Sequence, residues 1–127
     1  MRILTLEQLL EIHALVIMET GGSMGLRDLG RLEAAIATQT QNVFGEELYH
    51  TLLEKPAAII RGIIADRAFI DGNKRTAMLS GLTLLRMNGF DFVASSGEIE
   101  DFAVHIATSK LDVPAIVKWL DKHSKTR

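Results

Sequence analysis

Residues 66–77 of the chain, DRAFIDGNKRTA, place five charged side chains between two apolar segments. In the segment before them, isoleucine pairs recur at helical spacing over residues 59–64, which predicts a helix that starts around Pro56 and ends near Asp66. A buried strand would also accept this β-branched run, but the alanines at 57 and 58 favour a helix. The Gly-Asn pair then marks a turn, so the stretch predicts a helix, a loop and a second helix.

The second helix is expected to run from Lys74 or Arg75 to Met87, because Asn88 and Gly89 are typical of a helix C-terminus. Its apolar side chains cover most of its circumference, which is typical of a central helix. They are Met78, Leu79, Leu82, Leu84 and Leu85. We therefore expect this helix in the middle of the fold.

The rest of the chain also predicts helices, so we expect a single all-α domain over residues 1–127, a small helical bundle with the loop between its two central helices. Capping residues, prolines and apolar stripes define the other helices. Their expected positions are Thr5 to Gly21, Asp28 to Phe44, Glu46 to Leu53, Ser95 to Ile106 and Pro114 to Leu120. The stretch FDFVAS is expected to be briefly extended, and the final HSKTR to be frayed.

The composition predicts a soluble, cytoplasmic protein with a well-formed core. Hydrophobic residues make up 47% of the chain, and the formal net charge of −2 argues against broad nucleic-acid binding. The absence of cysteine removes disulfides and thiolate metal sites, and the four histidines show no zinc spacing. The N-terminal segment is amphipathic rather than continuously apolar, so we expect neither a signal peptide nor a membrane span.

The loop has the residues of an anion site. A helix start presents unpaired backbone N–H groups and the positive end of the helix dipole, which together bind phosphate. Gly72 lets the backbone turn, Asn73 can donate its amide, and Lys74 and Arg75 add charge that disfavours the helix unless an anion is bound. Asp71 can hold Mg²⁺ against phosphate oxygens. A plain turn between helices is the alternative, and spacing alone leaves both open.

The same residues resemble the signature loop of the Fic/Doc superfamily, specifically of its Doc (death-on-curing) toxins, whose pattern is His-x-Phe-x-Asp/Glu-x-Asn-Lys-Arg. The matching positions are Phe69, Asp71, Asn73, Lys74 and Arg75. Lys74 is typical of Doc, since the Fic enzymes carry glycine there. The early segment GGSMGLRDLGRLEAAI and the all-helical pattern are also Doc-like, so the resemblance spans most of the chain.

The resemblance implies transfer of a group from a nucleotide to a protein hydroxyl. Most Fic proteins transfer AMP, whereas Doc phosphorylates a threonine of elongation factor Tu and stops translation; Lys74 favours the phosphoryl transfer. ATP (or another nucleotide) and Mg²⁺ are then the cofactors. By resemblance, the metal is held by Asp71, the phosphates by Phe69, Gly72, Asn73, Lys74 and Arg75, and the catalytic set is Asp71, Lys74, Arg75 and position 67.

Position 67 departs from the pattern, because Arg67 stands where the family has its general-base histidine. Neutral imidazole accepts a proton near pH 7, whereas guanidinium cannot. Loss of a general base typically lowers the rate by about 10²- to 10⁴-fold, so we expect this chain to be impaired. It is either an inactivated toxin or a natural binding protein that keeps the pocket without the chemistry; the intact remainder of the loop favours the first.

Three further expectations concern partners and neighbouring residues. The resemblance implies a Phd-type antitoxin whose C-terminal segment binds an apolar groove, here expected on the first two helices. Arg27, Asp28 and Arg31 lie near the glycine-rich segment, and Asp28 is read mainly as a helix cap. His13 lies on an apolar helix face and is expected to be a hydrogen-bonded core histidine. An AMP-transferring enzyme and a non-catalytic nucleotide- or partner-binding module remain the alternative functions.

Overall fold

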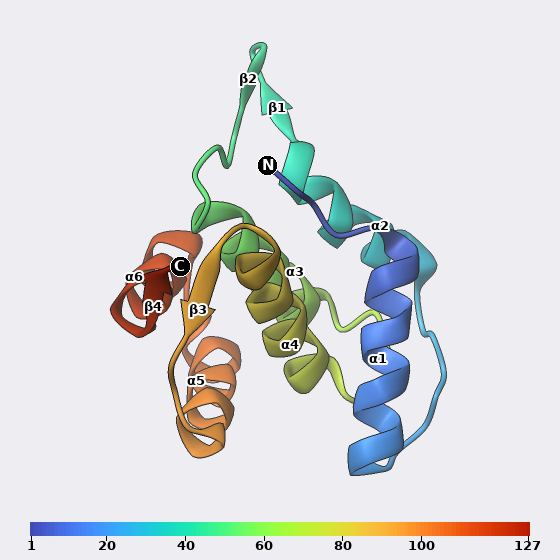
Figure 1. Cartoon of the computed structure of the whole chain (residues 1–127). Helices are drawn as coiled ribbons and strands as arrows, with labels where there is room; N and C mark the ends of the chain where they lie inside the picture. The colour runs from blue at the N-terminus through green and yellow to red at the C-terminus, as the bar shows by residue number, and fades with distance from the viewer.

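The computed structural model describes residues 1–127 as six α-helices with short connections (Figure 1). The helices are α1 Leu6–Thr20, α2 Leu29–Ala37, α3 Glu54–Asp66, α4 Asn73–Met87, α5 Ser96–Ser109 and α6 Val113–His123. A 3₁₀ turn, Thr38–Thr40, follows α2. Four strands of two or three residues form two small antiparallel pairs: β1 Asn42–Val43 with β2 Glu46–Glu47, and β3 Phe90–Phe92 with β4 Ser124–Thr126. The predicted all-α class is confirmed.

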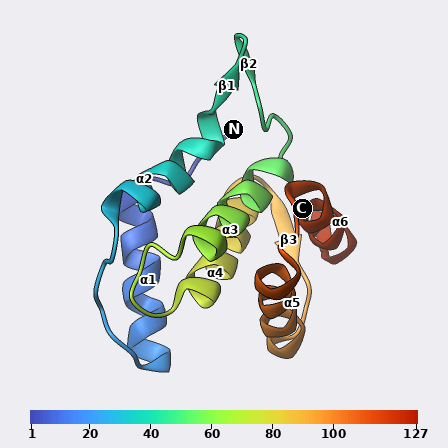
Figure 2. The ribbon, with the colours of Figure 1, turned by 180° about the vertical axis from the view of Figure 1, so that it is seen from behind.

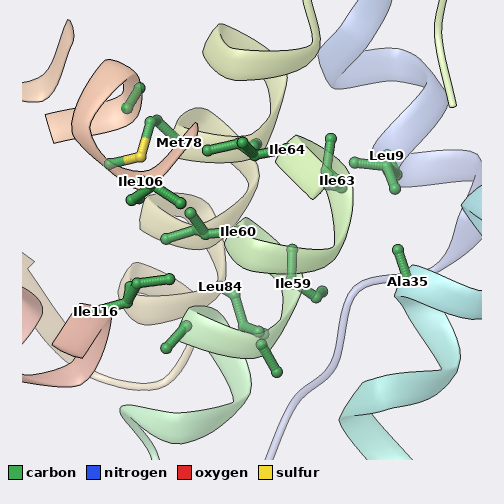
Figure 3. Packing of buried hydrophobic residues seen from close by; sticks show 14 of the residues in the cluster. Leu9, Ala35, Ile59, Ile60, Ile63, Ile64, Met78, Leu84, Ile106 and Ile116 are labelled. Carbon is green, nitrogen blue, oxygen red and sulfur yellow. The ribbon is translucent and has the colours of Figure 1, made fainter. Parts of the chain in front are cut away.

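Helices α3 and α4 form the centre of the fold, with α1 and α2 on one side and α5 and α6 on the other (Figures 1 and 2). All isoleucines of α3 are buried and interlock with residues of the surrounding helices (Figure 3). Gly81 lets α3 and α4 approach closely, because a Cβ atom there would lie 2.4 Å from the side chain of Ile60. The helix prediction for residues 59–64 is therefore confirmed, and the strand alternative is wrong.

Local capping explains where several helices begin. Thr5 with Gln8, and Ser95 with Glu98, form the two expected capping boxes. Asp28 accepts a hydrogen bond from the Arg31 N–H, which confirms its predicted role as a cap. Helix α6 begins one residue before Pro114, after Asp112 caps it.

The helix predicted from Glu46 to Leu53 is wrong. The chain forms the β1–β2 hairpin there, which projects from the helical body (Figures 1 and 2). Its tip consists of Phe44 at φ 52° and Gly45 at φ 83°, and two successive left-handed residues turn the chain back on itself. Helix α2 therefore ends at Ala37 rather than near Phe44.

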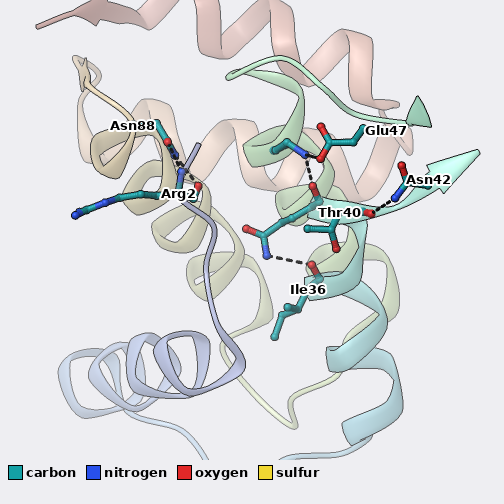
Figure 4. A network of polar contacts seen from close by, with 8 residues as sticks. Arg2, Ile36, Thr40, Asn42, Glu47 and Asn88 are labelled. Carbon is teal, nitrogen blue, oxygen red and sulfur yellow. Dashed lines mark hydrogen bonds and ion pairs between the residues drawn. The ribbon is translucent and has the colours of Figure 1, made fainter. Parts of the chain in front are cut away.

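A buried polar network anchors this hairpin to the helices (Figure 4). The ammonium of Lys55 donates to the carbonyl of Gln39 and pairs with the Glu47 carboxylate at 3.2 Å. The Gln39 side chain in turn bonds the backbone N–H and carbonyl of Leu4, at 2.8 and 2.9 Å. The hairpin is thus specified by contacts with distant parts of the chain, which a helical apolar pattern does not reveal.

The C-terminal tail is ordered rather than frayed, which also contradicts the sequence prediction. Residues Ser124–Thr126 pair with Phe90–Phe92, the part of FDFVAS that is extended as expected. The pairing supplies hydrogen-bond partners to a tail that carries no apolar residue to bury. No helix of this chain combines the length and apolarity that crossing a bilayer requires.

Candidate active site

The loop between α3 and α4 reverses the chain within six residues. Arg67 ends α3 in the left-handed conformation, at φ 50°, and Gly72 precedes α4 at φ 78°. A Cβ atom on Gly72 would lie 3.1 Å from the Ile17 side chain of α1, so glycine serves both the backbone conformation and the close packing here.

Helix α1 supports the loop from its buried side. The His13 ring stacks on the Phe69 ring with 3.7 Å between centroids and 7° between planes. Its Nε2 lies 2.9 Å from the Asp71 carbonyl oxygen, to which the N–H donates. This confirms the prediction of a hydrogen-bonded core histidine, since His13 is 3% exposed. The stack on Phe69 was not predicted, because residues 56 positions apart carry no pairwise pattern in one sequence.

The glycine-rich segment before α2 runs along the outer side of the loop. The N–H groups of Arg27 and Asp28 both donate to the Ala68 carbonyl, at 2.7 and 3.0 Å, and Ile70 N–H donates to the Gly25 carbonyl at 3.0 Å. The Ser23 N–H donates to the Asp71 carboxylate at 2.8 Å. These bonds fix both the backbone of the loop and the orientation of its carboxylate.

Asn73 closes the loop onto itself. Its side-chain oxygen accepts from the Phe69 N–H at 3.0 Å, and its amide donates to the Phe69 carbonyl at 2.8 Å. One proton of the amide group is used in this way, and the second has no partner in the structure, which leaves it free for the predicted contact with an anion. Asn73 therefore has a structural role that the motif alone did not indicate.

Phe69 is the predicted site residue whose side chain does not line the cleft described below. The ring is 1% exposed and belongs to the hydrophobic core, where it packs against His13. Phe69 is also the partner of Leu26 in an isolated antiparallel bridge, so its ring and its backbone both hold the loop in place. Phe69 thus supports the site without lining it.

Helix α4 starts without a capping side chain, since its N-cap residue is Gly72. Thr76 N–H is the first to find an acceptor, the Gly72 carbonyl at 2.9 Å. The backbone N–H groups of Asn73, Lys74 and Arg75 have no acceptor in the structure. Three unpaired donors at the positive end of a 15-residue helix form the type of site that phosphate groups bind.

These donors face a cleft of about 880 Å³ between the loop, α3, and the junction of α5 with α6. Six of the seven predicted site residues line it: Arg67, Asp71, Gly72, Asn73, Lys74 and Arg75. Five of the 14 Lys and Arg residues of the chain line the cleft, against one of its 16 Asp and Glu residues. A strongly cationic cleft in a protein of net charge −2 indicates an anionic ligand.

Two of the five cations were not predicted from the sequence. Arg61 reaches the cleft from the middle of α3, and Lys110 from the C-terminal end of α5. Arg61 had a signal, because it is the only charged residue between Pro56 and Asp66 in an otherwise apolar helix. Lys110 had none, since its position depends on how α5 packs beside α3.

Arg75 differs from the other cations because it has a partner. Its guanidinium pairs with the Glu100 carboxylate of α5 at 3.1 Å, and both side chains are about half exposed. Exposed pairs of this kind contribute little, so Arg75 can exchange Glu100 for a phosphate oxygen at small cost.

Asp71 is the one carboxylate that could hold a metal ion in the cleft. The structure contains no cluster of three or more His, Cys, Asp or Glu side chains able to bind a metal without help. Mg²⁺ does not require such a cluster, because it is commonly held by one or two carboxylates together with phosphate oxygens and water. A single carboxylate beside an anion site fits that donor set.

A second, mainly apolar groove of about 410 Å³ lies between α1, α4 and α5 and meets the cleft at Lys74 and Arg75. Its apolar side chains are Val16, Met78, Leu79, Leu82, Ile99, Ala103 and Val104. The expected groove on the first two helices thus has a counterpart that includes α1 but not α2.

The family described as "Fic/DOC family" matches residues 3–85. The chain is 36% identical over 102 residues to "Toxin Doc" of Mycolicibacterium smegmatis, which covers 79% of this chain and 78% of that protein. It is also 36% identical over 120 residues to "Protein kinase doc" of Escherichia phage P1, with 94% of each chain covered.

Proposed function

The chain belongs to the Fic/DOC family, and from this premise we propose that it is a Doc-like toxin whose fold transfers the terminal phosphoryl group of ATP to a hydroxyl of a translation protein. Elongation factor Tu is the proposed target, by resemblance. The observation that carries the proposal is the uncapped start of α4, where the side chains of Lys74 and Arg75 accompany three unpaired N–H groups. A cytoplasmic location follows from a substrate that belongs to translation.

In the proposed reaction the protein positions and neutralises the phosphates. The free N–H groups of Asn73, Lys74 and Arg75 bind phosphate oxygens, and the Lys74 and Arg75 side chains balance their charge. Asp71, oriented by the Ser23 N–H, would hold Mg²⁺, which when bound neutralises charge on the transferring group. Positioning and electrostatic stabilisation of this kind supply most of the catalysis of phosphoryl transfer.

Arg67 limits this chemistry in the present chain. Its guanidinium lines the cleft at the family's general-base position but cannot accept the proton of an attacking hydroxyl. We expect Arg67→His to raise the phosphoryl-transfer rate by about 10²- to 10⁴-fold, the usual contribution of general-base catalysis. Arg67→Gln is the matched control, because it removes the charge without supplying a base.

Two alternatives use the same cleft. An AMP-transferring enzyme would break the bond at the α-phosphate, and a non-catalytic module would bind nucleotide without breaking a bond. Lys74 favours phosphoryl transfer, since the Fic-type pattern has glycine there. The name of the phage relative, a protein kinase, supports the same choice.

The chain's proposed partner is a Phd-type antitoxin, as Doc toxins belong to toxin–antitoxin systems. The apolar groove between α1, α4 and α5 suits an amphipathic helix of such a partner. Leu79 and Val104, which line it, are 41% and 50% exposed in the free chain. A helix seated there would also lie beside Lys74 and Arg75 and so block the neighbouring cleft.

The decisive experiment uses the Arg67→His variant with ATP labelled in the γ or the α position. We expect transfer of the γ label to elongation factor Tu and arrest of growth when the variant is expressed without a partner. Transfer of the α label instead would establish AMP transfer. Unchanged growth together with no transfer of either label would contradict the toxin proposal.

A further inference from the structure

Arg61 and Lys110 are the two cleft cations that lie outside the α3–α4 loop and the start of α4. Neither has an ion-pair partner in the structure, and both side chains belong to exposed residues. We propose that they form a second anion-binding subsite, which binds an acidic side chain of the protein substrate next to the hydroxyl that receives the phosphoryl group. This inference rests on the proposed function of the cleft as a nucleotide site.

The two residues come from elements other than the α3–α4 loop and the start of α4. Arg61 lies six residues before Arg67 on α3, which corresponds to about 9 Å along the helix axis. Lys110 caps α5 in the left-handed conformation at φ 49°, and its N–H donates to the Ile106 carbonyl. Helices α3 and α5 contact each other, and each contributes one of the two cations to the lining of the cleft.

The charge balance of the cleft favours a ligand besides the nucleotide. The start of α4 already offers three free N–H groups together with the side chains of Lys74, Arg75 and Arg67. With Mg²⁺ these groups are sufficient to neutralise one triphosphate, as in other phosphoryl-transfer sites. Arg61 and Lys110 are then an excess of positive charge, and no carboxylate of the chain other than Asp71 lines the cleft.

The volume of the cleft is large enough for two ligands. Its volume of about 880 Å³ is at the upper end of small-molecule pockets, which range over about 300–1,000 Å³. A protein hydroxyl must enter the cleft to reach the terminal phosphate, so neighbouring residues of that substrate necessarily pass its rim. Exposed cations at a rim steer and orient acidic partners.

The test uses two synthetic peptides, one with a threonine flanked by four glutamates and one with the same threonine flanked by four glutamines. Their binding to the full chain is measured by fluorescence anisotropy at low salt, and ATP binding is measured separately by calorimetry. We expect the glutamate peptide to bind about three- to tenfold more tightly, a preference that disappears as salt screens the charges. The Arg61→Ala/Lys110→Ala variant should remove this preference and change ATP affinity less than twofold.

A matched control is Lys118→Ala/Lys122→Ala, which removes two exposed cations of α6 outside the cleft. This variant should keep the glutamate preference, because its two cations lie outside the cleft. It serves as the control because it changes the net charge by the same amount as Arg61→Ala/Lys110→Ala. If Arg61→Ala/Lys110→Ala also keeps the preference, or if it instead weakens ATP binding severalfold, the proposed subsite is wrong. Failure of ATP to bind the unaltered chain would contradict the proposed function. The preference for the glutamate peptide would still show whether the Arg61–Lys110 subsite exists.

Discussion

The α3–α4 loop, residues 67–72, and the β1–β2 hairpin, residues 42–47, are both short connections that follow a helix, yet only the loop was predictable. Besides its bonds with His13 and with residues 23–28, the loop closes on itself through the two local bonds between Asn73 and Phe69. The hairpin is anchored by residues outside it: Lys55, which contacts Gln39 and Glu47, and Gln39, whose side chain bonds Leu4. Locally encoded bonds leave a signature in sequence, and distant anchors do not.

Asn73→Ala should have the largest effect on stability in this comparison. It removes both bonds to Phe69, each worth about 0.5–1.5 kcal/mol, so the free energy of unfolding in urea should fall by about 1–3 kcal/mol. Hydrogen exchange at the Phe69 amide should also accelerate. Asn42→Ala in the hairpin is the matched control, because its one exposed bond to Thr40 should contribute far less. Equal losses in the two variants would break the distinction between the two connections.

Lys55→Met tests the distant anchor of the hairpin. The variant keeps the buried aliphatic stem but loses the bond to the Gln39 carbonyl and the pair with Glu47, which should lower the free energy of unfolding by about 1–2 kcal/mol. Hydrogen exchange should accelerate over residues 42–48 and stay unchanged over residues 67–76. Lys118→Met, on an exposed face of α6, is the control. A hairpin that remains as protected as before would mean that its own residues specify it.

The same comparison explains which elements could be predicted from the sequence and which could not. The capped starts of α1, α2 and α5 were predicted because each depends on residues within one turn of each other. The helix–loop–helix around residues 66–77 was predicted because a Gly-Asn turn stands between two apolar segments. The β3–β4 pair was missed because its two strands lie far apart in the sequence, and the hairpin was missed because Lys55 and Gln39, which anchor it, lie outside it. In the site, six of the seven predicted residues line the cleft, whereas the Phe69 ring is buried in the core. Lys110 carried no sequence signal, because its place in the cleft depends on how α5 packs beside α3.

Phe44→Asn sharpens the comparison at the hairpin tip and should have a smaller effect. Phe44 is fully exposed and left-handed, so its ring packs on nothing while its backbone is strained. Asparagine tolerates this conformation better, and we expect the free energy of unfolding to rise by up to about 1 kcal/mol. Thermal unfolding measures this change, with Arg67→Asn as the matched substitution at the left-handed residue of the loop. A marked loss of stability for Phe44→Asn would contradict the view that the exposed Phe44 ring makes no stabilising contact.

The pH dependence of stability at the α5 cap should be the smallest of these effects. The cap lies outside both the loop and the hairpin, so it serves as a reference for them. Hydrogen bonding from the Ser95 backbone N–H, and then from its side chain, lowers the pKa of Glu98 below its ordinary value. Because the folded pKa is lower than the unfolded one, the cap contributes stability above the unfolded pKa and loses it as pH falls through the folded value. Glu98→Gln should therefore lower the free energy of unfolding near neutral pH. In acid, the variant and the unaltered chain should have the same free energy of unfolding. A difference between the two that is constant with pH would contradict this cause.

The central claim is that phosphates bind the uncapped start of α4, and amide NMR tests it most directly. A non-hydrolysable ATP analogue with Mg²⁺ is titrated into the ¹⁵N-labelled chain. We predict the largest shifts at the N–H groups of Asn73, Lys74 and Arg75, with the hairpin amides of residues 42–47 unchanged. Shifts that gather elsewhere, or unchanged α4 amides at saturating analogue, would contradict the account.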